Sequence, residues 1–174
     1  MPVSEHIPPD PFEPELEVEE EVIEEQPAQP MLQYCIFRAG RERYCLDVLE
    51  VDEVVEWPHL TPLPLAPPFV MGIFNLRGVI VPVADIAFTE GRRADMPPRQ
   101  VVVACQRGGV TAAEVRLGIA VDEVFGTYST SEPLIREEAP PEVPHCKGML
   151  RQGERLALAL DLARLLESFP VPVI

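Results

Sequence analysis

The segment from Pro67 to Ile86, PPFVMGIFNLRGVIVPVADI, constrains the fold more than any other part of the chain. Two short apolar runs flank Asn75-Leu76-Arg77-Gly78, and asparagine and glycine are typical of tight turns. Glycine is favoured there because it adopts positive φ without steric cost. The segment is therefore predicted to form two strands joined by a turn that carries Arg77. Pro82 is expected to end the second strand or to form a bulge in it.

Further short strands are predicted along the chain, separated by turns rich in glycine and proline. A short helical turn that leads into a strand ending at Trp57 is expected after Val48. Asp161 is expected to cap one late helix, residues 162–166. The remaining predicted strands cover residues 33–37, 43–48, 100–106, 115–121, 146–151 and 155–160. Many short strands with a single late helix predict an all-β fold of the barrel type.

Two features bear on how this fold is divided. The tetrapeptide Val-Asp-Glu-Val occurs at residues 51–54 and again at residues 121–124, which indicates two related units. The polar connector from Phe88 to Pro98 is the best internal boundary between them. Residues 59–68 contain four prolines and are predicted to be an ordered extended loop. The leucines of that loop are expected to cover a barrel end or a groove of a partner.

The net charge of −15 is unevenly distributed. Residues 1–30 contain ten acidic residues, seven prolines and no Lys or Arg, which predicts a disordered, solvated arm. Apolar residues within it, Leu16, Val18, Val22 and Ile23, leave open that part of the arm orders on a partner. No basic stripe suits nucleic acid, and the acidity argues against anionic lipid. No apolar run approaches the length of about 18 residues that spans a bilayer.

Residues that carry chemistry form no recognisable constellation in this sequence. The four cysteines form no CxxC pair and no metal-ligand spacing with the three histidines. The four serines include no GxSxG elbow, and no phosphate-binding glycine loop is present. We therefore expect no enzymatic activity, no cofactor and no metal. The cysteines are expected to be free and mostly buried, as in a cytosolic protein.

The stretch from Pro67 to Ile86 resembles the signature of the CheW-like domain family. The shared pattern is a proline pair, a hydrophobic trio, a glycine, Asn-Leu-Arg-Gly, a branched trio and then Pro-Val-x-Asp-Ile. The resemblance runs from about Gln33 to Glu167. It implies two small five-stranded SH3-like β-barrels packed together, with a first barrel of about 32–88, a second of about 99–160 and a short helix at 161–167. The arm, residues 1–31, falls outside the resulting domain, residues 32–168.

The resemblance also implies a function and a set of partner-binding residues. Members of this family are non-catalytic adaptors that couple a CheA-type histidine kinase to chemoreceptors, so the implied location is the cytoplasm, at receptor arrays. The implied partners are the regulatory domain of the kinase and the helices of the receptor's cytoplasmic tip. Arg77 and Glu53 are hypothesised to pair on one face of the first barrel. The implied partner-binding residues are Val51, Glu53, Gly72, Asn75, Leu76, Arg77, Gly78, Val121 and Val124.

Three alternatives remain open from the sequence. An adaptor of a non-chemotaxis array, for surface sensing or twitching, would have the same fold. An inhibitor would act through its acidic arm. A β-barrel enzyme is the weakest alternative because no catalytic constellation is visible. For Val121 and Val124, a place in the barrel core competes with a place in a receptor-binding groove.

Overall fold

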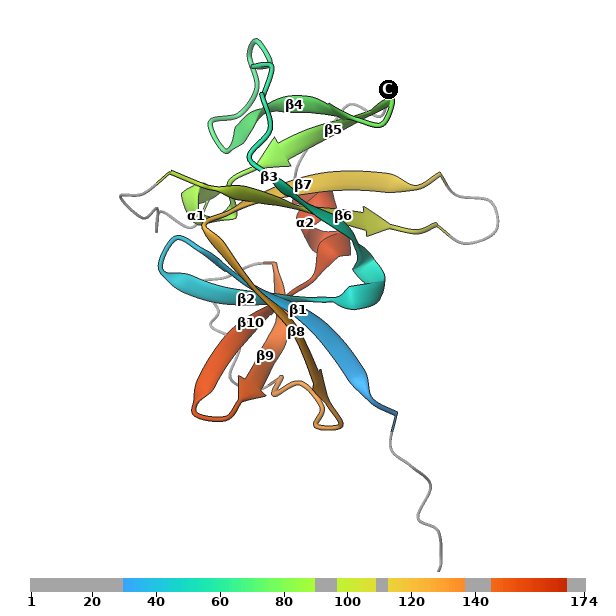
Figure 1. The fold of residues 1–174 in the computed structure, drawn as a ribbon, viewed down its shortest axis with the longest axis vertical. Helices are drawn as coiled ribbons and strands as arrows, with labels where there is room; N and C mark the ends of the chain where they lie inside the picture. The colour runs from blue at the N-terminus through green and yellow to red at the C-terminus, as the bar shows by residue number, and fades with distance from the viewer. Residues whose placement is uncertain (1–29, 90–96, 109–112, 137–144, 169–174) are drawn as a thin grey trace, which may run out of the picture.

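Two five-stranded β-sheets make up the protein in a computed structural model, which describes residues 30–89, 97–108, 113–136 and 145–168. Sheet A has the strand order β8-β1-β2-β10-β9 and occupies the lower half of Figure 1. Sheet B has the order β3-β6-β7-β5-β4 and occupies the upper half. The elements are β1 (Leu32–Ala39), β2 (Glu42–Asp47), η1 (Val48–Glu50), β3 (Val51–Glu56), β4 (Val70–Leu76), β5 (Val79–Ala84), α1 (Ile86–Thr89), β6 (Gln100–Gln106), β7 (Val115–Val121), β8 (Glu123–Thr130), β9 (Cys146–Gln152), β10 (Arg155–Leu160) and α2 (Leu162–Ser168).

The two sheets exchange strands between the halves of the chain. Sheet A combines β1 and β2 with β8, β9 and β10, whereas sheet B combines β6 and β7 with β3, β4 and β5. The predicted division into a barrel of 32–88 and a barrel of 99–160 is therefore wrong. The error arises because β3 leaves β2 for the other sheet, and a sequence pattern does not reveal which strand a given strand will pair with.

Residue pairing nevertheless confirms two related units. In the β4–β5 hairpin Gly72 lies opposite Val83, and in the β9–β10 hairpin Gly148 lies opposite Ala159, each beside a bulge. The Val-Asp-Glu-Val segments themselves are not equivalent. A bulge follows Val51 in β3 and Val124 in β8, so Val51 corresponds to Val124 and not to Val121.

The core explains why the central strands are apolar on both faces. Alternate residues of β1 and β6 point into the interior of their own barrel, as Ile36 and Val103 do. The residues between them, such as Phe37 and Val102, join one large cluster that also takes residues from β2, β7, β10, α1 and α2. This cluster lies between the two sheets, and we call it the seam. Burial on both faces produces near-continuous hydrophobic runs in place of simple alternation.

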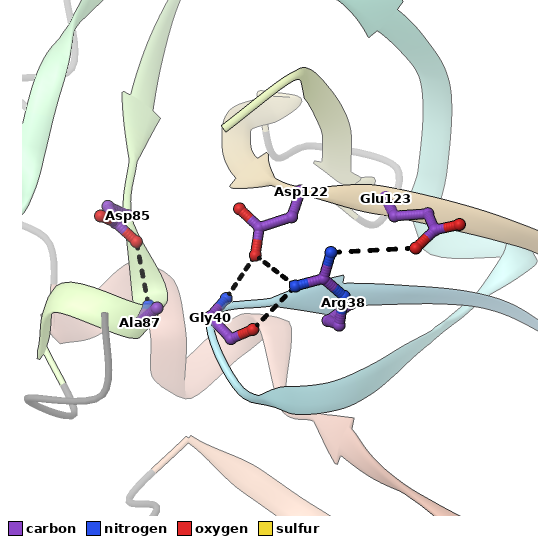
Figure 2. A network of polar contacts seen from close by, with 6 residues as sticks. All are labelled: Arg38, Gly40, Asp85, Ala87, Asp122 and Glu123. Carbon is purple, nitrogen blue, oxygen red and sulfur yellow. Dashed lines mark hydrogen bonds and ion pairs between the residues drawn. The ribbon is translucent and has the colours of Figure 1, made fainter. Parts of the chain in front are cut away.

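A half-buried aspartate, Asp122, ties the two sheets together at the point where β7 leads into β8 (Figure 2). Asp122 accepts a hydrogen bond from the backbone N–H of Gly40 at 2.8 Å and one from the Arg38 guanidinium at 3.1 Å. Its own backbone N–H donates to the carbonyl of Arg38 at 2.9 Å. These contacts anchor the β1–β2 turn of sheet A to the end of a sheet B strand.

Most of the predicted local structure is confirmed. Each predicted strand is present, a 3₁₀ turn precedes β3, and the Asp161 carboxylate accepts a hydrogen bond from the Arg164 N–H at the start of α2. Three details differ: β8 was not predicted as a strand, α1 is a second short helix, and β5 runs through Pro82 without a break. The predicted disordered arm lies outside the described residues apart from Pro30 and Met31.

The four cysteines are free and buried, as predicted. Burial is the main cause that raises the pKa of the Cys45 thiol to about 12, and it also raises the pKa values of the Cys35 and Cys105 thiols. Such thiols are poor nucleophiles and poor metal ligands at neutral pH because both roles need the thiolate. Within the part of the chain that the structure describes, no helix has the length and apolar character needed to cross a membrane.

Candidate functional site

The β4–β5 turn presents the arginine that the sequence analysis selected. Leu76 pairs with Val79, so the turn has two central residues, Arg77 with φ +51° and Gly78 with φ +90°. Positive φ at both positions is the geometry that matches the twist of a two-residue hairpin. The Asn75 side-chain oxygen accepts the Gly78 N–H at 2.6 Å and holds the turn. The prediction of positive φ at Gly78 is confirmed, and Arg77 shares it although it has a side chain.

Arg77 is directed by a carboxylate on β3, the strand at the other end of the order of sheet B. Its guanidinium donates to the Glu53 carboxylate at 3.1 Å, which confirms the hypothesised pair. The Arg77 side chain is 80% exposed, whereas that of Glu53 is 23% exposed. An exposed pair of this kind contributes about 0–1 kcal/mol to stability. The pair therefore orients Arg77 while leaving most of its donors available to a partner.

A second cluster of charges borders this pair and was not predicted. Arg116 on β7 donates to Asp52 at 2.9 Å and to Glu114 at 3.0 Å. The hydrogen bond from Arg116 to Asp52 is the largest cause of the raised pKa of Arg116, so the guanidinium stays charged. Asp52 precedes Glu53, so β3 carries adjacent carboxylates that two different arginines hold. The sequence signal was the run Asp52-Glu53, whose partners depend on strand neighbours that the sequence does not reveal.

Exposed apolar side chains lie beside the turn. Val79 and Ile80, the first residues of β5, are 41% and 47% exposed, and Leu76 is half-buried against the interior of the sheet B barrel. We call the surface formed by Glu53, Asn75, Arg77, Gly78, Val79 and Ile80 the turn face. A charged side chain among exposed aliphatic ones is a common composition of a protein-binding surface.

Gly72 has a structural part in this site. It is buried with φ +143°, and a Cβ atom there would lie 2.6 Å from the carbonyl oxygen of Thr61. Thr61 forms two backbone hydrogen bonds with Ile73, at 2.8 and 2.9 Å, so the 59–68 loop is fixed against the edge of β4. The glycine allows this approach, which supports the hairpin that carries the turn face.

The predicted site residues do not all reach the surface. Glu53, Asn75, Arg77 and Gly78 lie together on the turn face, whereas Gly72 lies farther back along β4, against the 59–68 loop. Val121 is fully buried in the seam, so its place is the core. Val51 and Val124 are half-buried and pack against the same cluster. Among the described residues no group of three or more His, Cys, Asp or Glu side chains is placed to hold a metal ion.

Comparison with known proteins agrees with this architecture. The model of the CheW-like domain matches residues 33–169. The "Probable chemotaxis protein CheW" of Rhizobium etli is 30% identical over 129 residues, which cover 72% of this chain and 76% of the relative. The "Chemotaxis protein CheW" of Klebsiella aerogenes is 30% identical over 140 residues, which cover 78% of this chain and 82% of the relative.

A solved structure has the same fold. The crystal structure of the scaffolding protein TtCheW from Thermoanaerobacter tengcongensis superposes with a TM-score of 0.66 at 24% identity and covers 79% of this chain and 89% of that one. The exchange of strands, the turn face and the family match over residues 33–169 lead to one assignment. This chain belongs to the CheW-like domain family.

Proposed function

We propose that this protein is a non-catalytic scaffold that couples a CheA-type histidine kinase to chemoreceptors in chemotaxis. The observation that carries the proposal is the turn face. Arg77 is exposed there, at a turn with positive φ, and its ion pair with Glu53 orients its guanidinium. A guanidinium presents planar paired donors that suit a carboxylate of a partner. Several relatives named as chemotaxis CheW proteins support the same role.

The proposed mechanism is positional. The turn face docks on the regulatory domain of the kinase, and a second surface that includes the exposed edge of β8 near Val124 receives a helix of the receptor tip. Val121 takes no direct part because its side chain is buried in the seam. Signals then pass as shifts in these contacts. The location we propose is the cytoplasm at receptor arrays, held there by protein contacts.

Charge reversal at the turn face tests the kinase contact. The kinase regulatory domain from the same organism is titrated against the full chain, the Arg77→Glu variant and the Glu53→Arg variant. We expect each variant to bind about tenfold or more weakly, because reversing a charge at a complementary interface costs more than removing it. Folding stability should change by no more than about 1 kcal/mol.

The matched control is Arg107→Glu, which makes the same charge change at an exposed arginine for which the described residues provide no ion-pair partner. It should leave the affinity within about twofold, as expected of a charge outside the interface. If both turn-face variants bind as tightly as the control, the kinase does not dock on the turn face.

A further inference from the structure

Two arginines at equivalent positions of the two units have different partners. Parallel pairing places Gly118 opposite Val83 and Cys45 opposite Ala159, so Arg116 in β7 and Arg43 in β2 occupy matching positions. Arg116 holds the carboxylates of Asp52 and Glu114. Arg43 has no ion pair among the described residues.

An aromatic ring takes the place of the missing carboxylate. The position that matches Asp52, next to the bulge, is Phe125 in β8, and the Arg43 guanidinium lies 4.1 Å from the centroid of its ring. Phe125 is 40% exposed although it is a large apolar residue. A cation over an aromatic face is a weak contact at an exposed site, so the arginine keeps capacity for an anion.

The surface around this pair is open. The position that matches Glu53 is Gly126, and the position that matches Arg77 is Gly153. A Cβ atom at either glycine would meet no heavy atom within 4 Å. The residues that crowd the turn face in one unit are therefore absent at the matching place in the other. Phe125, Gly126 and Arg43 form a surface with one exposed ring and one cation without an ion pair among the described residues, and we call it the ring face.

We propose that the ring face is the docking site for this chain's own acidic segment, residues 15–25. That segment reads Glu-Leu-Glu-Val-Glu-Glu-Glu-Val-Ile-Glu-Glu and places carboxylates on both sides of apolar residues. Its carboxylates supply the anions that Arg43 lacks, and Val22 and Ile23 cover the exposed Phe125 ring. The ten acidic residues of 1–30 with no Lys or Arg make this the most complementary stretch of the chain for a cation.

The segment is long enough to reach the ring face. The chain enters the described part at residue 30, and Leu32 pairs with Thr130 at the end of β8. Phe125 lies back along the same strand at about 17 Å from Thr130, taking the usual rise per strand residue. The stretch from Ile23 to Leu32 spans up to about 30 Å when extended.

The docked segment covers the surface beside Val124 that we propose as the binding site of the receptor helix. The inference does not depend on that assignment, since it concerns a contact within one chain. If both hold, a receptor helix has to displace the acidic segment, and rising salt favours that displacement by weakening the contact with Arg43.

Paramagnetic relaxation enhancement on the full chain tests this docking. A nitroxide is attached at Gln26→Cys, a position that can be labelled selectively because the native cysteines are buried. In low salt the amide signals of Phe125, Gly126 and Thr127 should broaden. Arg43→Gln should lower the docked population about twofold to fivefold, the effect expected of one ion pair. Phe125→Ser should lower it further, whereas Arg107→Gln, an equal loss of charge elsewhere, should leave it unchanged.

Two results would overturn the proposal. Broadening confined to residues near Leu32, and unaffected by the Arg43 and Phe125 substitutions, would show that the segment does not visit the ring face. Broadening in an isotope-labelled chain mixed with a spin-labelled, isotope-free chain would show that the segment docks on a second copy. Raising the salt concentration to about 1 M, where screening acts over about 3 Å, should lower the docked population about as much as Arg43→Gln does, because it weakens the ion pair and not the apolar contact.

Discussion

At Gly72 a single added methyl group should strongly destabilise the protein. Its φ of +143° lies in a region that side chains rarely adopt, and an added Cβ would lie 2.6 Å from the Thr61 carbonyl oxygen. That oxygen cannot retreat freely, because Thr61 is held by two backbone hydrogen bonds to Ile73. The substitution Gly72→Ala therefore combines backbone strain with a clash against fixed backbone.

The size of the effect follows from two reference glycines. Gly78 has φ +90° with open space around it, so Gly78→Ala should cost only the conformational term of about 1–2 kcal/mol. Gly148, which matches Gly72 in the other unit, has φ +156° and a Cβ distance of 3.1 Å to the Ile135 carbonyl oxygen, so a cost of about 2 kcal/mol is expected. For Gly72→Ala, strain and clash together should cost about 3–4 kcal/mol.

Urea unfolding followed by circular dichroism measures these differences for the wild type and the three variants. At roughly 3 °C per kcal/mol for a domain of this size, Gly72→Ala should also lower Tm by about 10 °C. The order of loss should be Gly72, then Gly148, then Gly78. A Gly72→Ala variant that loses no more stability than Gly78→Ala would refute the argument from the fixed Thr61 carbonyl.

Three other predictions follow from the structure. Asp122→Ala should lower the free energy of unfolding by about 1–3 kcal/mol in urea titrations, because it leaves the Gly40 N–H without its acceptor, whereas Glu123→Ala, 56% exposed in its side chain, should cost under about 1 kcal/mol. Burial lowers the pKa of His145 from 6.5, so the unfolded chain binds a proton more readily than the folded one. The free energy of unfolding should therefore fall as the pH drops below about 6.5, and it should fall less in the His145→Gln variant. The thiol of Cys45, with a pKa of about 12, should resist maleimide at pH 8 in the native protein and react once the protein is unfolded, as mass spectrometry can show.

The sequence predicted local structure well where local chemistry decides it. The turn at Asn75–Gly78 was predictable because asparagine and glycine meet its backbone demands, and the capping of α2 by Asp161 was predictable from its side chain. The strand β8 was not, since Gly126 interrupts its pattern and most of its residues are exposed. The partners of Asp52 and the burial of Val121 depend on which strands lie side by side, and that is decided by tertiary packing.

The candidate site was predicted in part for the same reason. Arg77 and Glu53 are 24 positions apart, and only the likeness to a known motif suggested that they pair. The residues alone left Val121 and Val124 divided between the barrel core and a receptor-binding groove, and strand packing places Val121 in the seam. The matching of Arg43 with Arg116 required the strand registers of both sheets.

The exchange of strands between the sheets also affects how this protein folds during its synthesis. Sheet A needs β1 and β2 from the beginning of the described chain and β9 and β10 from its end, and Tyr44 pairs with Leu158 directly. During synthesis the first hairpin therefore emerges long before its neighbours exist, with apolar residues such as Phe37 and Tyr44 uncovered. Contacts between residues so distant in sequence slow folding. Sheet A can consequently be completed only after the last strand has left the ribosome.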